Sequence, residues 1–342
     1  MAPLKVFAFD YVMEGGQTAR ALPRAFTQQG EMLIDALVAD LETVPGVEVC
    51  TMATLRGPGP GLAPPGPSFA ERFAACVQTA DAVWPLAPES DGLLENLSRD
   101  ILRGKRILLG SAPGAVRVAA SKFKVARALA EGGVPTVPTY RPHAALPAGE
   151  GAWVVKPDDG AGCVDTRLFS NRAAALAWIR TSAVQGYILQ PFVAGKLGSL
   201  SLLCCDGAAR LLARNQERVV VHDNRFHFLG STVNGLIDAD GALERLAQQV
   251  AAALPTLWGY VGVDIILTDR GAVVLDVNPR LTAAYAGLHA SIGCNPAGLV
   301  IDLLKGPAMP ALPTRRRVVS VDVGSVDAGS FDAGSFEPSA PT

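Results

Sequence analysis

The segment VGVDIILTDRGAVVLDVNPR, Val261 to Arg280, decides the fold of this chain. Its two apolar runs, VGVDIILT and GAVVLDVN, predict buried strands, because branched apolar side chains pack well on a pleated surface. The short stretch Asp269-Arg270-Gly271 between the runs predicts an antiparallel pair. Polar residues nevertheless interrupt the second run. Asp276 and Asn278 stand two positions apart, so in a strand their side chains point to the same face, roughly 7 Å apart along the chain.

These polar residues indicate a metal site. If the two strands pair, Asp276 and Asn278 meet Asp264 of the first run at one end of the hairpin. Magnesium prefers hard oxygen ligands and commonly uses a few carboxylates together with substrate phosphates. Asp276 could bridge two ions, and Arg280 adds a cation beside them. The alternative is that Asp276 and Asn278 only end a strand and accept hydrogen bonds from turn donors.

Composition narrows the class of protein. The chain has 342 residues, is 49% hydrophobic and 18% charged, and carries a formal net charge of -2. These values favour a compact enzyme of about two or three domains or lobes and argue against nucleic acid as the main partner. The start, MAPLKVFAFDYVMEGG, lacks the pattern of a secretion signal, and no apolar run reaches the ~18 residues of a membrane span. We therefore expect a cytoplasmic protein without a membrane partner.

Strand and helix patterns alternate up to about residue 112, which predicts an α/β layer of Rossmann type. After that point the pattern is α+β. Within the first region, RGPGPGLAPPGP (56–67) predicts a loop. The tail contains GSVDAGSFDAGSFE, a five-residue repeat that is too short for a solenoid. We expect residues after about 318 to be loosely attached. The predicted units are 1–112, 113–195, 196–312 and a low-complexity tail, 313–342.

Two lysines and a glycine-containing loop point to phosphate binding. Lys156 ends the apolar run WVVK just before PDDGAGC, where its ammonium and the backbone N–H groups of the loop can meet phosphate oxygens. Lys122 in ASKFK is a second candidate. Either lysine taken singly could be a solvated surface charge. Neither a Walker sequence nor a G-x-G-x-x-G fingerprint is present, which argues against a nicotinamide-dependent oxidoreductase.

In chain order these pieces resemble the ATP-grasp superfamily of carboxylate-amine ligases, over roughly residues 112–306, with DVNPR preceded by Asp264 as the most specific element. The resemblance implies a pre-ATP-grasp domain followed by two α+β lobes: the small lobe at 113–195 and the large lobe at 196–312. It also implies ATP and two Mg²⁺ ions, with Mn²⁺ as an alternative. The implied nucleotide contacts are Lys122, Lys156, Gly160, Ala161, Gly162, Gln190, and the backbone of Phe192 and Val193. The implied metal ligands are Asp264, Asp276 and Asn278, and the implied catalytic residues are Arg280 and Lys156.

Two positions depart from the superfamily pattern. Asp276 stands where glutamate is common, so the spacing of the metal ions is in doubt. No acidic residue follows LQPFVAG (189–195) to hold the ribose.

The stretches FAFDYVMEGG, LAPESDGLL, ARNQE and NPRLTAAYAGL look like those of the tyramine-glutamate ligase group within this superfamily. That group serves methanofuran biosynthesis, and the resemblance implies amide formation between the γ-carboxyl of glutamate and an arylethylamine through an acyl phosphate. Candidate substrate contacts are Asp10, Tyr11, Glu89, Asn215, Gln216 and Tyr285, with loop capping as the alternative role. Another amino-acid or peptide ligase, and a nucleotide-binding homologue without turnover, remain open, as does a homodimer.

Overall fold

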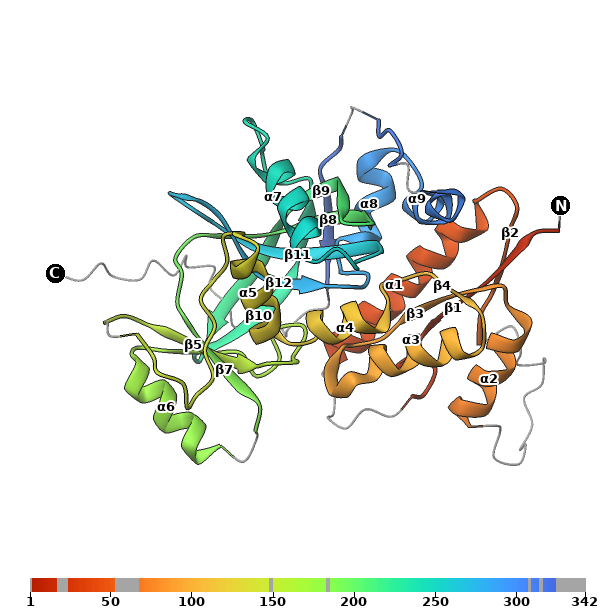
Figure 1. The fold of residues 1–342 in the computed structure, drawn as a ribbon. Helices are drawn as coiled ribbons and strands as arrows, with labels where there is room; N and C mark the ends of the chain where they lie inside the picture. Colours follow the sequence, from red (N-terminus) through yellow and green to blue (C-terminus); the bar gives the residue numbers. More distant parts are fainter. Residues whose placement is uncertain are drawn as a thin grey trace.

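The N-terminal domain is a parallel sheet between helices. The computed structural model describes residues 2–16, 24–52, 68–147, 150–182, 185–306, 309–313 and 316–323. The strand order of the first sheet is β2-β1-β3-β4, and the α/β layer predicted for this region is confirmed (Figure 1). Its elements are β1 (Leu4–Asp10), α1 (Arg24–Glu42), β2 (Val47–Cys50), α2 (Phe69–Thr79), β3 (Ala82–Leu86), the short helix η2 (Ser90–Gly92), α3 (Leu93–Arg103) and β4 (Ile107–Leu108). The predicted loop at 56–67 lies outside the described residues.

Alternation along β1 explains why both of its faces are covered. Val6 and Ala8 belong to a core cluster that includes Leu33 and Leu37 of α1, whereas Phe7 and Phe9 belong to a separate cluster with residues of α2 and α3. Successive side chains of a strand point to opposite faces, so a strand with four consecutive buried apolar residues, Val6 to Phe9, must be covered on both faces. Helices therefore cover this sheet on both sides.

The rest of the chain forms one curled sheet of nine strands. Its order is β12-β11-β8-β9-β10-β6-β5-β7, and β13 pairs with β10. The strands are β5 (Trp153–Pro157), β6 (Arg167–Phe169), β7 (Tyr187–Pro191), β8 (Lys196–Cys205), β9 (Ala208–His222), β10 (Arg225–Val233), β11 (Gly259–Thr268), β12 (Gly271–Asn278) and β13 (Val319–Asp322). β6 pairs with β10, so the sheet runs through both predicted lobes, and the division at residue 195 stays a prediction.

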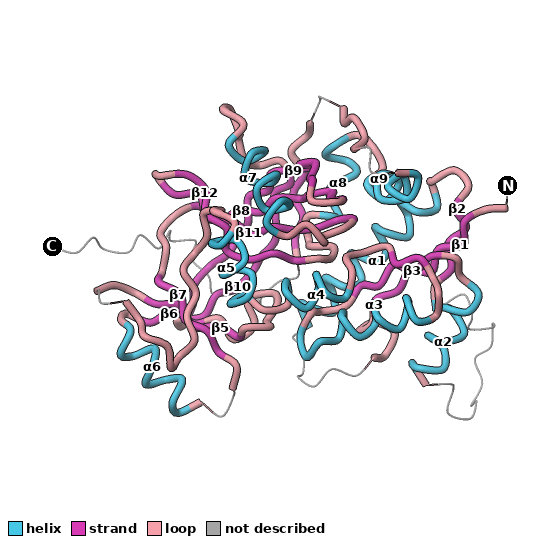
Figure 2. The backbone as a smooth tube through the Cα atoms, in the orientation of Figure 1, coloured by secondary structure: helices cyan, strands magenta, loops and turns pink. Residues whose placement is uncertain are grey.

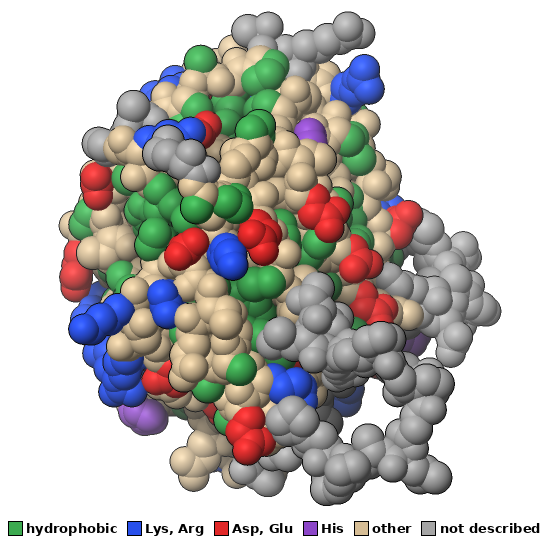
Figure 3. Space-filling model, turned by 90° about the vertical axis from the view of Figure 1, so that its right-hand side faces the viewer, with side chains coloured by type: hydrophobic (Ala, Val, Ile, Leu, Met, Phe, Trp, Pro, Cys, Tyr) green, Lys and Arg blue, Asp and Glu red, His purple; other side chains and the backbone are tan. Residues whose placement is uncertain are grey.

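Helices lie on the curled sheet and between it and the N-terminal domain (Figure 2). They are α4 (Pro113–Ala119), α5 (Lys122–Glu131), α6 (Arg172–Thr181), α7 (Ala242–Ala253), α8 (Tyr285–Ile292), α9 (Pro296–Asp302) and η3 (Leu303–Lys305). α5 and α7 pack on the face that holds Leu200 and Leu202, and α6 covers β5 and β6. Among the residues that the structure describes, none of the helices combines the length and apolar composition needed to cross a bilayer. The face drawn in Figure 3 carries acidic and basic side chains interspersed.

The strand β13 corrects the expectation for the tail. Residues after about 318 were expected to be loosely attached, but Val319–Asp322 pair with Gly230–Val233 of β10, and Val321 is buried. The backbone hydrogen bonds of a strand depend little on side-chain identity. A segment whose sequence does not predict a strand can therefore still pair with a strand at the edge of a sheet. The five-residue repeat itself lies outside the described residues.

A buried carboxylate joins the N-terminal domain to the second sheet. The Oδ2 atom of Asp40 in α1 accepts a hydrogen bond from the Tyr285 hydroxyl at 2.9 Å, and its Oδ1 atom lies 2.6 Å from Nδ1 of His289. The Asn295 amide donates to the Asp40 carbonyl at 2.7 Å. Because Asp40 and Tyr285 are both buried, these bonds are shielded from water and fix α1 against α8.

Replacing Tyr285 with phenylalanine should therefore weaken the junction between the two parts of the chain. We expect Tyr285→Phe to lower the free energy of unfolding by about 1–2 kcal/mol, because a buried carboxylate oxygen loses its donor. Urea unfolding at neutral pH measures this change. Tyr140→Phe is the matched control, since the ring of Tyr140 packs on Trp153 with centroids 6.0 Å apart. Equal stability of Tyr285→Phe and wild type would contradict this structural role.

Candidate active site

The curled sheet encloses a cavity of about 900 Å³. Strands β8 to β12 form one wall, and β5, β7 and the loop after β5 form the other. All the nucleotide-binding and metal-binding candidates predicted from the sequence line it. These are Lys122, Lys156, Gly160, Ala161, Gly162, Gln190, Phe192, Val193, Asp264, Asp276, Asn278 and Arg280. The structure thus brings together residues spread over about half of the chain, while their individual roles stay predictions.

Two carboxylates face each other across adjacent strands. β11 and β12 pair antiparallel, as predicted, with Asp264 directly opposite Asp276 and Gly262 opposite Asn278. The Asn278 amide donates to Oδ2 of Asp264 at 3.2 Å. Burial, together with the negative charge of Asp276, raises the pKa of Asp264 to about 6. Such a pair creates a need for a cation at this end of the hairpin.

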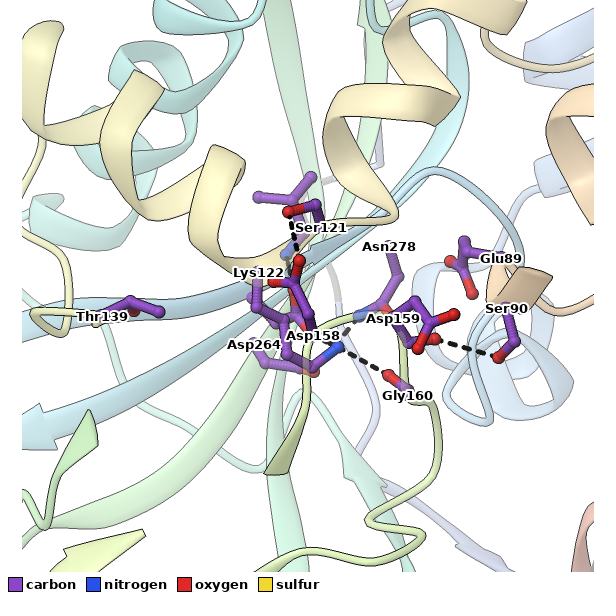
Figure 4. A network of polar contacts seen from close by, with 12 residues as sticks. Glu89, Ser90, Ser121, Lys122, Thr139, Asp158, Asp159, Gly160, Asp264 and Asn278 are labelled. Atoms are coloured by element: carbon purple, nitrogen blue, oxygen red, sulfur yellow. Dashed lines mark hydrogen bonds and ion pairs between the residues drawn. The ribbon is translucent and has the colours of Figure 1, made fainter. Parts of the chain in front are cut away.

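Two lysines approach this pair from other elements. Lys122, the first residue of α5, places Nζ 2.8 Å from Oδ2 of Asp276 and 2.6 Å from the Gly160 carbonyl oxygen (Figure 4). Burial acts to lower its pKa, but Asp276 outweighs that effect and the pKa is raised. Lys156 at the end of β5 is only 6% exposed, and burial lowers its pKa to about 8. Both ammonium groups are therefore directed at the cavity rather than at solvent.

Asp158 fixes the position of Lys122. Its Oδ1 atom accepts the backbone N–H of Phe123 at 2.9 Å, and its Oδ2 atom accepts the Ser121 hydroxyl at 2.8 Å. The Arg141 guanidinium donates to the same oxygen at 3.1 Å. A carboxylate at a helix N-terminus satisfies backbone donors and complements the helix dipole. The loop after β5 and the start of α5 are thereby held together, a role that the sequence reasoning did not assign.

The N-terminal domain reaches the cavity at several points, and Gln29 of α1 lines it directly. Glu89 accepts a hydrogen bond from Nε of Arg280 at 2.9 Å, with both side chains nearly buried. Ser90 donates to the Asp159 carbonyl oxygen at 2.9 Å, next to the glycine loop. Glu89, predicted as a substrate contact, therefore orients Arg280. Burial acts to lower the pKa of Arg280, but Glu89 outweighs it and the pKa is raised, so the guanidinium stays charged.

Apolar residues line the part of the cavity that is predicted to hold the nucleotide. The Gln190 amide donates to the Thr139 hydroxyl at 2.8 Å, which fixes its orientation in the wall. Val154 and Leu275 also line this space. Flat apolar walls with a few fixed polar groups are typical of a site for a planar ligand.

Three predicted substrate contacts, two on β9 and one on α8, do not line the cavity. Asn215 is fully buried and donates to the hydroxyls of Ser199 and Ser201 at 3.1 and 3.0 Å. Gln216 is its neighbour on β9, so its side chain points to the opposite face. The hydroxyl of Tyr285 is engaged by Asp40. Asn215 and Tyr285 therefore make hydrogen bonds within the protein, and the substrate contacts predicted for them stay predictions.

Asp10 and Tyr11 also do not line the cavity. Oδ1 of Asp10 accepts the backbone N–H groups of Val12 and Met13, both at 2.9 Å, so its carboxylate caps the turn after β1. The ring of Tyr11 packs edge-on against Phe69 at 4.6 Å. The capping role that the sequence left as the alternative fits the contacts of Asp10.

Sequence reasoning missed Glu217, the third carboxylate that lines the cavity. It lies on β9 and accepts hydrogen bonds from the hydroxyls of Ser199 and Ser231. Burial raises its pKa to about 7. The sequence contains a signal for Glu217, because Asn215 and Glu217 are two positions apart in an apolar strand, as Asp276 and Asn278 are.

The oxygen donors at the hairpin fit magnesium. Asp264, Asp276 and Asn278 offer two carboxylates and one amide oxygen on one face of two paired strands, and burial leaves the carboxylates in need of positive charge. Magnesium typically takes one or two protein carboxylates and completes its shell with phosphate and water. Within the described ranges no group of three or more His, Cys, Asp or Glu side chains forms a metal cluster.

Comparisons with known proteins agree with this geometry. Residues 119–284 match the model of an ATP-grasp domain, and residues 61–116 match that of a pre-ATP-grasp domain. The chain is 26% identical over 208 residues to a tyramine–L-glutamate ligase of Methanocaldococcus fervens and 26% identical over 214 residues to that of Methanocaldococcus jannaschii. The matches cover 61% and 63% of this chain, and only 61% and 60% of the two relatives' own lengths.

The fold has solved counterparts. A crystal structure from Archaeoglobus fulgidus, assigned to the ATP-grasp superfamily, superposes with a TM-score of 0.65 at 19% identity. The superposition covers 94% of this chain and all of the other one. The fold predicted from the sequence, an α/β domain followed by two α+β lobes, is thereby confirmed.

The buried carboxylate pair should reduce stability when no ligand is bound. The folded-state pKa of Asp264, about 6, lies above its ordinary value of 3.8. Folding therefore favours the protonated acid, and the penalty grows as pH rises from about 4 to about 6. We expect Asp264→Asn to stabilise the ligand-free protein by roughly 1–3 kcal/mol at pH 8, with the gain shrinking as the pH falls from about 6 to about 4 and absent below pH 4. Chemical unfolding at several pH values tests this, and a variant less stable than wild type at pH 8 would contradict it.

Proposed function

The chain belongs to the ATP-grasp superfamily, and on that premise we propose that it is an ATP-dependent ligase that joins a carboxylate to an amine. The observation that carries the proposal is the cavity itself. Three cations, Lys122, Lys156 and Arg280, face the carboxylates of Asp264 and Asp276 around one space. A site that gathers a polyphosphate and a second anion needs cations directed into it, together with oxygen ligands for a metal ion.

The chemistry explains why ATP is required. A carboxylate is a poor electrophile at neutral pH, because oxide is a very poor leaving group. Transfer of the γ-phosphoryl group makes an acyl phosphate, whose phosphate can leave when an amine attacks. Two anions must meet for the first step, so the protein has to neutralise their repulsion. This requirement assigns roles to the charged residues of the cavity.

Lys122 and Lys156 would bind the phosphates of ATP, and Arg280, oriented by Glu89, would hold the substrate carboxylate or the phosphoryl group in transfer. Asp264, Asp276 and Asn278 would hold magnesium, which supplies further positive charge to the phosphate oxygens. The loop from Gly160 to Gly162 would cover the phosphates and keep water from the acyl phosphate. Bound phosphate would raise the pKa of Lys156, because its negative charge opposes the effect of burial.

For the substrates we propose glutamate, reacting at its γ-carboxyl, and tyramine or a similar amine, in the synthesis of a methanofuran-type cofactor. The names of the two relatives support this choice, and so do the stretches FAFDYVMEGG and NPRLTAAYAGL. Another amino-acid or peptide ligase is the second candidate, favoured by the polar wall at Glu217 that the relatives' names do not explain. A panel of amines with glutamate and MgATP, followed by mass measurement of the product, separates the two.

Removal of the charge of Lys156 or of Asp276 should greatly reduce turnover. We expect Lys156→Ala and Asp276→Ala each to lower amine-dependent ADP formation at least about 100-fold, because each removes a charge that stabilises the transferring phosphoryl group. Lys124→Ala and Asp269→Ala remove exposed charges nearby and serve as matched controls. Coupled-enzyme detection of ADP measures the rates, and circular dichroism checks folding. Near-normal turnover by both site variants would refute the mechanism, and nucleotide binding without turnover by wild type would favour a non-catalytic homologue.

A further inference from the structure

Glu217 is a buried carboxylate that the mechanism above does not use. Its Oε1 atom accepts hydrogen bonds from the hydroxyls of Ser199 and Ser231, the latter at 3.3 Å. Its Oε2 atom is almost inaccessible to solvent and has no hydrogen-bond partner in the described part of the chain. An unsatisfied carboxylate oxygen costs free energy when it is buried. Because Glu217 lines the cavity, a ligand with hydrogen-bond donors can supply the missing partner.

The sheet register separates Glu217 from the metal end of the cavity. Ser199 on β8 pairs with Asp264 on β11 and with Asn215 on β9, and Glu217 lies two residues beyond Asn215 on the same face. Two strand spacings therefore separate Asp264 from β9, roughly 10 Å between backbones. Ligands of one Mg²⁺ bind it at about 2.0–2.1 Å. The hydroxyl of Ser199 stands between the two carboxylates and bonds to Glu217, so Glu217 is directed to a neighbouring site rather than to the same ion.

We propose that Glu217 binds the ammonium group of the acceptor amine through its free oxygen and removes one proton from it. The inference rests on the proposed function, which needs an amine beside the acyl phosphate. Ser199 and Ser231 are positioning residues that hold the other oxygen. An ammonium group is the complement of this carboxylate, since it brings positive charge and three N–H donors to an oxygen that lacks a partner.

The proton balance follows directly. The ammonium gives a proton to the Glu217 carboxylate, and the neutral amine attacks the acyl carbon with its lone pair. The C–N bond forms as the C–O bond to phosphate breaks, and that electron pair leaves with the phosphate oxygen. The second proton of the amine goes to the departing phosphate. Burial raises the pKa of Glu217 to about 7, which suits a base that works near neutral pH.

The hairpin beyond Glu217 indicates which amines fit. Val219 and Val221 continue along β9 on the face of Glu217, and they pair with Phe228 and Phe226 of β10. All four line the cavity and are only partly buried. Apolar side chains left partly exposed inside a cavity favour an apolar ligand group. The acceptor site therefore suits a primary amine with an aryl-alkyl substituent.

Hydroxylamine separates the two half-reactions. It is largely neutral at pH 7 and traps an acyl phosphate as a hydroxamate without needing a base. With glutamate, MgATP and tyramine, we expect Glu217→Gln to lower amide formation about 100-fold or more, while hydroxamate formation falls less than about tenfold. The wild-type amide rate should rise with pH through about 7, and that inflection should be absent in the variant. Ser231→Ala should raise the KM for tyramine more than it lowers kcat.

Each other outcome has a defined meaning. Glu131→Gln removes an exposed carboxylate of α5 and is the matched control. Equal losses of amide and hydroxamate in Glu217→Gln, or a higher Mg²⁺ requirement, would overturn the amine role in favour of a phosphate or metal role. If wild type makes neither product, the proposed function itself fails. Thermal unfolding of Glu217→Gln, with and without MgATP, reports folding and nucleotide binding, and a normal shift with MgATP is expected.

Discussion

The structure depends on the repulsion between two carboxylates that strand pairing places side by side. Asp264 and Asp276 are directly opposed on β11 and β12, where side chains lie about 5 Å apart. Neither charge is well solvated, so the pair is tolerated only because Lys122 contacts Asp276 and Lys156 lies near both. A buried charge that loses its partner is strongly destabilising. Elements far apart in the chain must therefore stay in register around this hairpin.

Contacts between the two parts of the chain maintain that register. Asp158 ties the loop after β5 to the start of α5, and Ser90 ties the same loop to the N-terminal domain. Glu89 holds Arg280 from the other side. The N-terminal domain is consequently part of the site, although no side chain from its sheet approaches the carboxylate pair. Its contribution is to hold a cation and a loop at fixed positions, and this kind of preorganisation reduces the rearrangement needed during reaction.

Sequence patterns predicted the features that depend on neighbours along the chain. Period-two and period-3.6 apolar spacing located the strands and helices, and polar residues inside an apolar strand located Asp276 and Asn278. Contacts between residues far apart in the chain produce no such pattern in the sequence. Arg280 and Glu89 are 191 positions apart, and Tyr285 and Asp40 are 245 apart, so the sequence predicts a substrate contact for Tyr285 and gives no sign of its hydrogen bond to a buried aspartate. Nothing in its local sequence distinguishes these two roles.

The backbone of the loop after β5 is strained at residues that follow the glycines. Gly162, Cys163 and Asp165 all adopt left-handed backbone angles, with φ between 54° and 61°. For residues other than glycine this conformation costs roughly 1–2 kcal/mol, so the surrounding contacts must impose it. Left-handed residues in a turn can direct backbone N–H groups toward an anion. Burial raises the pKa of the Cys163 thiol to about 11, which makes it a poor nucleophile. These features support the proposed role of the loop as a cover for phosphate, whose negative charge would stabilise the two buried lysines.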